Sequence, residues 1–212
     1  MSIFFHKQLY RSSAVMSLLK NFSVTVCGAG ALGANIAESL VRSGFCQLRV
    51  IDRDRIEKRS LSTQPYYRSD IGAFKAKILA NNLYRVLGVS IDAHSKELTP
   101  ANADRLLANS AVAIDTFDNS VGPQAVKDYC TRVSIPCLHV RLAADYCEII
   151  WNQHYRVPSA ANDRVCDYPL ARNLVMLTVA VACKVIVTFA ATGEQQNLTC
   201  AIGDFAVQPL IL

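Results

Sequence analysis

Residues 22–33 read Phe-Ser-Val-Thr-Val-Cys-Gly-Ala-Gly-Ala-Leu-Gly, and this stretch decides the fold class. An apolar, strand-like run leads into a glycine-rich turn, and a helix-like run follows at residues 34–42. The spacing of Gly28, Gly30 and Gly33 allows a tight turn, a close backbone approach to a ligand and close packing of helix on strand. Because the first amides of a helix lack backbone partners and favour an anion, the stretch predicts a phosphate-binding turn.

Strand-like and helix-like runs alternate outward from this turn. The expected strands are residues 23–27, 47–51, 90–95, 111–115, 137–141, 146–151, 198–202 and 205–210. The expected helices are residues 34–42, 73–87, 122–132 and 174–191, and Thr99-Pro100 carries the signal for a further helix start. Short apolar strands separated by helices predict an α/β, Rossmann-like, doubly wound and mainly parallel sheet, which a C-terminal antiparallel hairpin extends.

Length and composition predict one domain over residues 1–212. The chain is 51% hydrophobic and 18% charged, which favours a buried core over disorder. We expect an N-terminal helical segment at 1–21, a nucleotide-binding core at 22–141, and a crossover loop, a buried helix and terminal strands at 142–212. The net charge of +5 comes from scattered arginines, so no nucleic-acid partner is expected.

Two segments and the cysteine content indicate where in the cell the protein is expected. The run from Leu174 to Ala191 is about as long as a bilayer requires, but Lys184 lies inside it, which favours a buried helix over a membrane span. His6, Lys7 and Arg11 interrupt the apolar residues of the N-terminus, so no secretory signal is expected. The eight cysteines form no C-x-x-C pair, which excludes the common zinc spacings and favours a cytoplasmic protein.

The residues after the second strand indicate which nucleotide is bound. Asp52 ends that strand, 24 residues after Gly28, where an acid can hold the ribose hydroxyls of either NAD or ATP. Several cations follow, namely Arg53, Arg55, Arg59 and Lys75. A dehydrogenase has no use for so many cations here, whereas a triphosphate site does, and Lys75 begins a helix from which it can reach β- or γ-phosphate oxygens.

The fourth strand ends in the sequence Asp115-Thr116-Phe117-Asp118-Asn119. Its carboxylates fall at the carboxyl edge of the expected sheet, where ligands of such folds bind. A carboxylate that faces phosphates is a natural ligand for Mg²⁺, so the segment predicts a metal-bound triphosphate.

Together, these motifs resemble the ThiF/MoeB and ubiquitin-activating (E1-like) enzyme family over about residues 21–141. The motifs that carry the resemblance are the glycine turn, Asp52 with Asp54, Gly72 to Lys75, and Asp115 to Asn119. The resemblance implies an ATP- and Mg²⁺-dependent adenylyltransferase. In that reaction the C-terminal carboxylate of a ubiquitin-like or sulfur-carrier protein attacks the α-phosphorus of ATP and forms an acyl-adenylate and pyrophosphate.

The resemblance also implies roles for particular residues. The implied ATP-binding residues are Gly28, Gly30, Ala31, Leu32, Gly33, Asp52, Asp54, Gln64, Lys75 and Asn119. Lys75 would offset charge on the leaving group, and Asp118 would hold the metal. Members of the family supply an arginine from an N-terminal segment across a homodimer, and Arg11 is the candidate for that role.

The chain departs from the family pattern at two positions. Ser60 and Thr63 stand where members usually carry an asparagine and an arginine, and Arg59 or Arg68 would have to replace the missing cation out of register. This departure leaves open a non-catalytic partner subunit that retains only the scaffold. An NAD-dependent dehydrogenase is the alternative enzyme, but it leaves Lys75 and Asp118 unexplained.

Cys166 is the remaining candidate for a catalytic residue. Family members that form a thioester place their cysteine in a comparable crossover loop, so Cys166 is either a nucleophile or an inert loop cysteine. The neighbouring Asp167 disfavours the thiolate, and we therefore expect an inert residue. His139, which falls in a strand, is expected to be a core histidine.

Overall fold

The computed structural model describes residues 2–118, 121–143, 145–157 and 171–210. Its centre is an eight-stranded sheet in the order β3-β2-β1-β4-β5-β6-β7-β8. The strands are β1 Ser23–Cys27, β2 Gln47–Ile51, β3 Asp92–His94, β4 Val112–Asp115, β5 Cys137–Ala143, β6 Tyr146–Trp151, β7 Leu198–Ala201 and β8 Val207–Pro209. Strands β1 to β5 pair in parallel, whereas β6, β7 and β8 each pair antiparallel with the strand before them. The predicted sheet and its antiparallel extension are confirmed.

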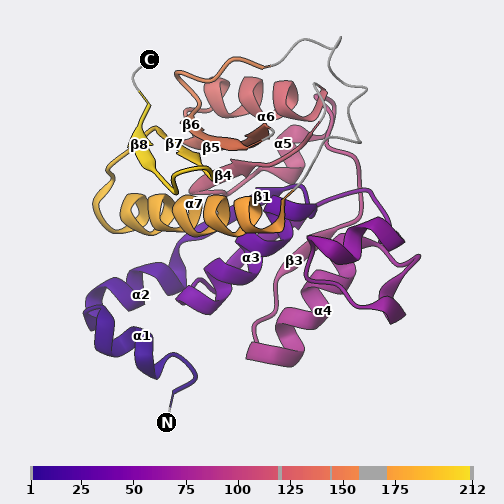
Figure 1. The fold of residues 1–212 in the computed structure, drawn as a ribbon, viewed down its shortest axis with the longest axis horizontal. Coiled ribbons are helices and arrows are strands. Elements are labelled where there is room, and N and C mark those ends of the chain that lie inside the picture. Colours follow the sequence, from indigo (N-terminus) through magenta and orange to yellow (C-terminus); the bar gives the residue numbers. More distant parts are fainter. Residues whose placement is uncertain (1, 119–120, 144, 158–170, 211–212) are drawn as a thin grey trace.

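Helices cover both faces of the sheet (Figure 1). They are α1 Phe5–Tyr10, α2 Ser13–Asn21, α3 Ala31–Ser43, α4 Lys75–Leu87, α5 Ala103–Leu106, α6 Val121–Arg132 and α7 Arg172–Thr192, with 3₁₀ turns at Lys58–Ser62 and Arg68–Asp70. Helices α3, α4 and α7 lie on one face, and α5 and α6 lie on the other. This is the doubly wound arrangement expected of strands separated by helices.

The two hydrophobic cores follow from the alternation of side chains along each strand. In β4, Val112 and Ile114 pack in the core under α3 and α7, while Ala113 between them packs in the core under α5 and α6. All three side chains are fully buried. Because successive residues of a strand point to opposite faces, one short strand supplies both cores.

Helix α7 is the expected buried helix. By length and composition it is long and apolar enough to cross a membrane, the one such helix in the described part of the chain. In the structure it packs against α3, and Val175, Val179 and Ile186 along it are almost completely buried. These contacts support the interpretation of α7 as a core helix.

The helix start predicted at Thr99-Pro100 is wrong. Helix α5 begins at Ala103, and Thr99 lies in the turn before it. The carbonyl oxygen of Thr99 accepts from the amides of Asn102 and Ala103, and the Asn102 side chain accepts from the Thr99 amide at 2.9 Å. This single turn is not continued into the helix, because the backbone at Asn102, with φ −122° and ψ 0°, is not helical, and α5 begins at the next residue.

Candidate functional site

The glycine turn between β1 and α3 is closely packed at its two ends and open in its middle. Gly28 has a φ of +104°, and a Cβ there would lie 2.7 Å from Thr116 Oγ1. A Cβ on Gly33 would lie 2.0 Å from the carbonyl oxygen of Gly28. A Cβ on Gly30 would meet no described atom within 4 Å. The outer glycines are thus required by the fold, while Gly30 keeps space free where α3 begins, as a bound phosphate would require.

Asp52 joins the end of β2 to this turn. Its carboxylate accepts from the amide of Ala29 and from the amide of Asp54, each at 2.6 Å. Burial raises the pKa of Asp52 above its ordinary value, against the opposing effects of Lys75 and of the two backbone hydrogen bonds. Asp52, which the sequence predicts to hold the ribose, thus lies at the end of β2 against the glycine turn and fixes that turn.

Lys75 is the first residue of α4, and its side chain is only 11% exposed. Its Nζ lies 3.3 Å from a carboxylate oxygen of Asp54, which belongs to the same loop as Asp52. Tyr66 connects this region to the glycine turn, because its hydroxyl donates to the carbonyl oxygen of Ala29 at 2.9 Å. No local sequence pattern distinguishes Tyr66 from an ordinary packing residue, which is why sequence reasoning missed this role.

The end of β4 carries a buried carboxylate that the sequence did not explain. Asp115 is fully buried, and its Oδ2 contacts His139 Nδ1 at 2.8 Å and Arg141 Nη2 at 2.5 Å. Its Oδ1 accepts from the amide of Phe117 at 3.1 Å. Burial alone would raise the pKa of Asp115, but Arg141 and His139 hold this pKa below its ordinary value. Both carboxylate oxygens are therefore engaged within the protein.

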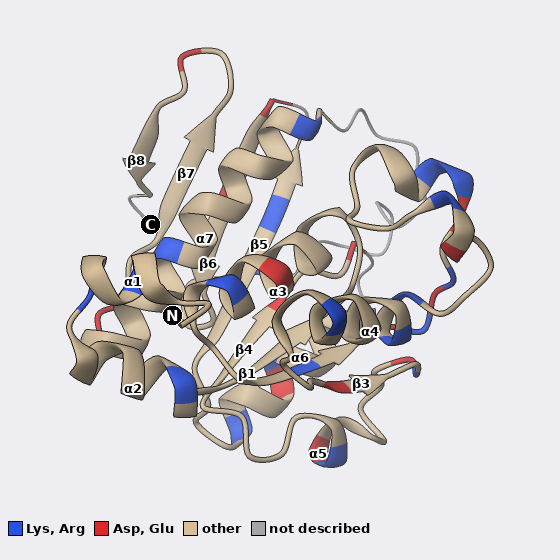
Figure 2. Ribbon diagram, turned by 90° about the horizontal axis from the view of Figure 1, so that it is seen from below, with Lys and Arg blue, Asp and Glu red and all other residues tan. Residues whose placement is uncertain are grey.

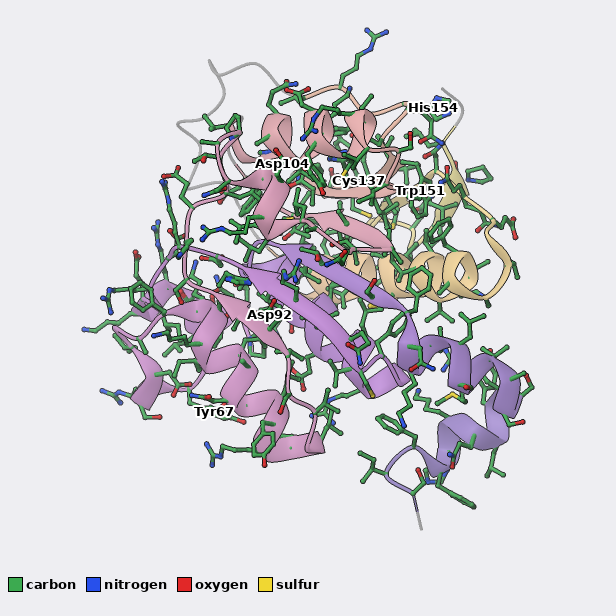
Figure 3. All side chains as sticks on the ribbon, turned by 180° about the vertical axis from the view of Figure 1, so that it is seen from behind. Tyr67, Asp92, Asp104, Cys137, Trp151 and His154 are labelled. Carbon is green, nitrogen blue, oxygen red and sulfur yellow. The ribbon has the colours of Figure 1, made fainter. Side chains whose placement is uncertain are left out.

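His139 is the buried core histidine that the sequence suggested. Its Nε2 lies 2.9 Å from Asn152 Oδ1, and the ring of Tyr155 stacks on it with the two centroids 3.7 Å apart. His154 is exposed and lies at the periphery (Figure 3). Neither histidine is free at the carboxyl edge to act as a base.

Asp118 differs from Asp115 in its surroundings. It is exposed, and its carboxylate makes no hydrogen bond or ion pair with another described residue. The segment is joined to the glycine turn, because the amide and hydroxyl of Thr116 both donate to the carbonyl oxygen of Cys27 at 2.9 Å. Because it is exposed, Asp118 could present its carboxylate oxygens to Mg²⁺, a hard cation that prefers oxygen donors.

The segment between β2 and α4 carries the departures from the family pattern. Ser60 and Thr63 are both buried: Ser60 forms a reciprocal cap with Glu57, and the carbonyl oxygen of Thr63 accepts from Asn35 Nδ2 at 2.8 Å. Arg59 is largely exposed, with its Nε 2.7 Å from a Glu57 oxygen. The cations here are interspersed with acids rather than gathered in a run (Figure 2).

Gln64 and Arg11 are further candidate residues that the structure describes. Gln64 Oε1 is buried without a hydrogen-bond partner among the described residues, as is Arg11 Nη1. Arg11 joins α1 to α2, and Met16 of α2 packs on Gly44, at the end of α3 opposite to the glycine turn. A helix of 13 residues is about 20 Å long, so Arg11 lies far from the turn of its own chain.

Two predicted site residues, Asn119 and Cys166, lie outside the described residues. Among the described residues, the structure brings together the glycine turn, Asp52, Lys75 and the segment that carries Asp118.

A doubly wound sheet, a glycine turn after its first strand and carboxylates at its carboxyl edge define a nucleotide-binding protein of the Rossmann type. The model of the ThiF family matches residues 7–198, and the chain belongs to this family. This membership does not favour the dehydrogenase alternative.

Among its relatives is "Adenylyltransferase and sulfurtransferase MOCS3" of Caenorhabditis briggsae, 33% identical over 56% of this chain and 30% of that protein. Another is "Sulfur carrier protein adenylyltransferase" of Thermus thermophilus, 32% identical over 56% of this chain and 44% of that protein. The chain thus spans less than half the length of these relatives. The crystal structure of E. coli MccB with ATP has a similar fold, with a TM-score of 0.80 at 16% identity over 98% of this chain and 69% of MccB.

Proposed function

We propose that this protein is an ATP-dependent adenylyltransferase that activates the C-terminal carboxylate of a ubiquitin-like or sulfur-carrier protein as an acyl-adenylate. The observation that carries the proposal is the convergence of an open glycine turn, a nearly buried lysine and an exposed carboxylate at one edge of the sheet. The names of the relatives support the reaction and the kind of substrate, and the ATP-bound MccB structure supports the nucleotide.

The residues suit this chemistry because nucleotidyl transfer depends mainly on positioning and on charge neutralisation. Amides of the glycine turn would hold phosphate oxygens, Asp52 would hold the ribose, and Lys75 would offset the charge of the departing pyrophosphate. Asp118 would hold Mg²⁺, which supplies positive charge beside the phosphates when it is bound. The attacking carboxylate is already ionised at neutral pH, so the reaction requires no general base.

A homodimer belongs to the same proposal. Arg11 is remote from the glycine turn of its own chain, and its Nη1 is buried without a hydrogen-bond partner among the described residues. Leu9 and Tyr10 beside it are 71% and 80% exposed, which suits helix α1 to a contact with a second copy. In that dimer Arg11 would reach the partner's nucleotide. A reducing, cytoplasmic location is also proposed, supported by the free thiols of the seven described cysteines.

A second candidate function is a non-catalytic partner subunit. Ser60 and Thr63 support it, because both are buried where family members usually carry an asparagine and an arginine, and the Ser60 side chain is engaged in capping the 3₁₀ segment. Such a subunit would bind ATP but would not exchange pyrophosphate into it.

An ATP–pyrophosphate exchange assay with a panel of ubiquitin-like and sulfur-carrier proteins tests the proposal. We expect exchange that depends on one of these proteins and that falls about a hundredfold in Asp118→Asn, the scale for the loss of one preorganised charged group. Asp104→Asn is the matched control, because Asp104 is an exposed carboxylate on α5 whose salt bridge is with Arg132. ATP binding without exchange for any panel member would favour the non-catalytic subunit.

A further inference from the structure

Arg141 on β5 connects two segments that meet at the carboxyl edge of the sheet. Its Nη2 donates to Asp115 Oδ2 at 2.5 Å, and its Nη1 donates to the carbonyl oxygen of Asp115 at 3.3 Å. Its Nε donates to the hydroxyl oxygen of Tyr155 at 3.0 Å. All three guanidinium nitrogens are therefore engaged by the protein, so Arg141 is not a spare cation for a ligand.

Asp115 carries the effect of Arg141 to the segment that follows β4. Its other oxygen accepts from the amide of Phe117, which closes the turn that leads directly to Asp118. On the opposite side, Thr116 bonds to the carbonyl oxygen of Cys27 at the end of β1. The direction in which Asp118 leaves β4 is thus fixed on the β1 side by the bonds of Thr116 to Cys27, and on the β5 side by the contact of Asp115 with Arg141.

Tyr155 holds the guanidinium of Arg141 in this orientation. The side chain is buried, its ring stacks on His139 with 12° between the ring planes, and its carbonyl oxygen accepts from Lys127 Nζ of α6. The ring is therefore fixed independently of its hydroxyl. Since the hydroxyl accepts from Arg141 Nε, removal of that one oxygen would loosen Arg141 without removing the stack.

We infer that Arg141 and Tyr155 are positioning residues for the Asp118 carboxylate and thereby set the affinity of the protein for Mg²⁺·ATP. The inference rests on the metal site in the proposed function. It assigns to Asp115, Arg141 and Tyr155 the role of residues that do not touch the metal but orient its ligand. Mutation of such residues commonly costs about 10–100-fold in metal affinity. A planar guanidinium is needed, because only its fork spans Asp115 and Tyr155 together.

The test compares ATP binding by the full chain in excess Mg²⁺ and in EDTA, measured by calorimetry. We expect Arg141→Met to weaken binding about tenfold in Mg²⁺ and to leave binding in EDTA unchanged. Arg141→Lys keeps the charge but not the fork, and should show the same selective loss. Tyr155→Phe removes one hydroxyl and should weaken ATP binding less, by about threefold, in Mg²⁺ and not in EDTA. Arg132→Met and Tyr146→Phe are the matched controls, because both side chains are exposed and neither is among the residues bonded to the Asp115 carboxylate.

Three outcomes would overturn the inference. A variant that weakens binding equally in Mg²⁺ and EDTA would mean that Arg141 acts on the nucleotide or on the fold. Variants that bind as the wild type does would mean that Asp118 needs no such support. Wild-type protein that binds ATP equally with and without Mg²⁺ would refute the proposed metal site and the inference with it, whereas the first two outcomes leave the proposed function intact.

Discussion

Two substitutions in the glycine turn test separately its contribution to stability and its contribution to nucleotide binding. A Cβ at position 33 would lie 2.0 Å from the carbonyl oxygen of Gly28, far inside any normal contact. Gly33→Ala must therefore push α3 away from the turn, and overpacking of this kind costs about 1–3 kcal/mol. For a chain of this length, each 1 kcal/mol lowers Tm by about 2–4 °C, so we expect a Tm lower by roughly 2–12 °C together with weaker ATP binding.

Gly30→Ala is the matched variant. A Cβ there meets no described atom within 4 Å, so the free energy of unfolding should change by less than about 1 kcal/mol. The added methyl group would nevertheless stand where a phosphate approaches the amides of α3, and ATP binding should weaken at least tenfold.

Thermal unfolding with and without ATP and Mg²⁺ measures both effects. An unchanged Tm for Gly33→Ala would refute the packing argument. Normal ATP binding by Gly30→Ala would show that the phosphates do not approach this part of the turn.

Three further predictions follow from the same site. ATP with Mg²⁺ should raise Tm in a thermal-shift assay and NADH should not; the reverse result would restore the dehydrogenase. Lys75→Met should lower the rate of ATP–pyrophosphate exchange about a hundredfold, and near-normal exchange would mean that another cation offsets the leaving-group charge. Because its folded-state pKa is depressed, Asp115 stabilises the fold above its unfolded pKa of about 3.9, and this stabilisation disappears as pH falls through the folded pKa. Between pH 5 and pH 3, the Tm of Arg141→Met should therefore decrease by less than the Tm of the wild type. An identical decrease in both would show that Arg141 does not lower the pKa of Asp115.

Local patterns in the sequence were enough to predict the strands, most of the helices and the sheet edge at which the candidate site residues lie. The glycine spacing is confined to six residues, and the strand and helix periods are visible within single segments. The position of Asp52 at the end of β2 follows from the same local reasoning. The prediction at Thr99-Pro100 failed because the backbone leaves the helical conformation at Asn102, which no periodic signal in the sequence marks.

Only the tertiary structure decided how the carboxylates at that edge divide their roles. The resemblance assigned the metal to Asp118, but no local pattern predicted that β5 would place His139 and Arg141 against Asp115, while Asp118 is exposed. These partners are more than twenty residues away along the chain, and Tyr155 is forty away from Asp115. Contacts over such separations are set by strand register and by packing of the crossover, and neither leaves a mark in the local order of residues.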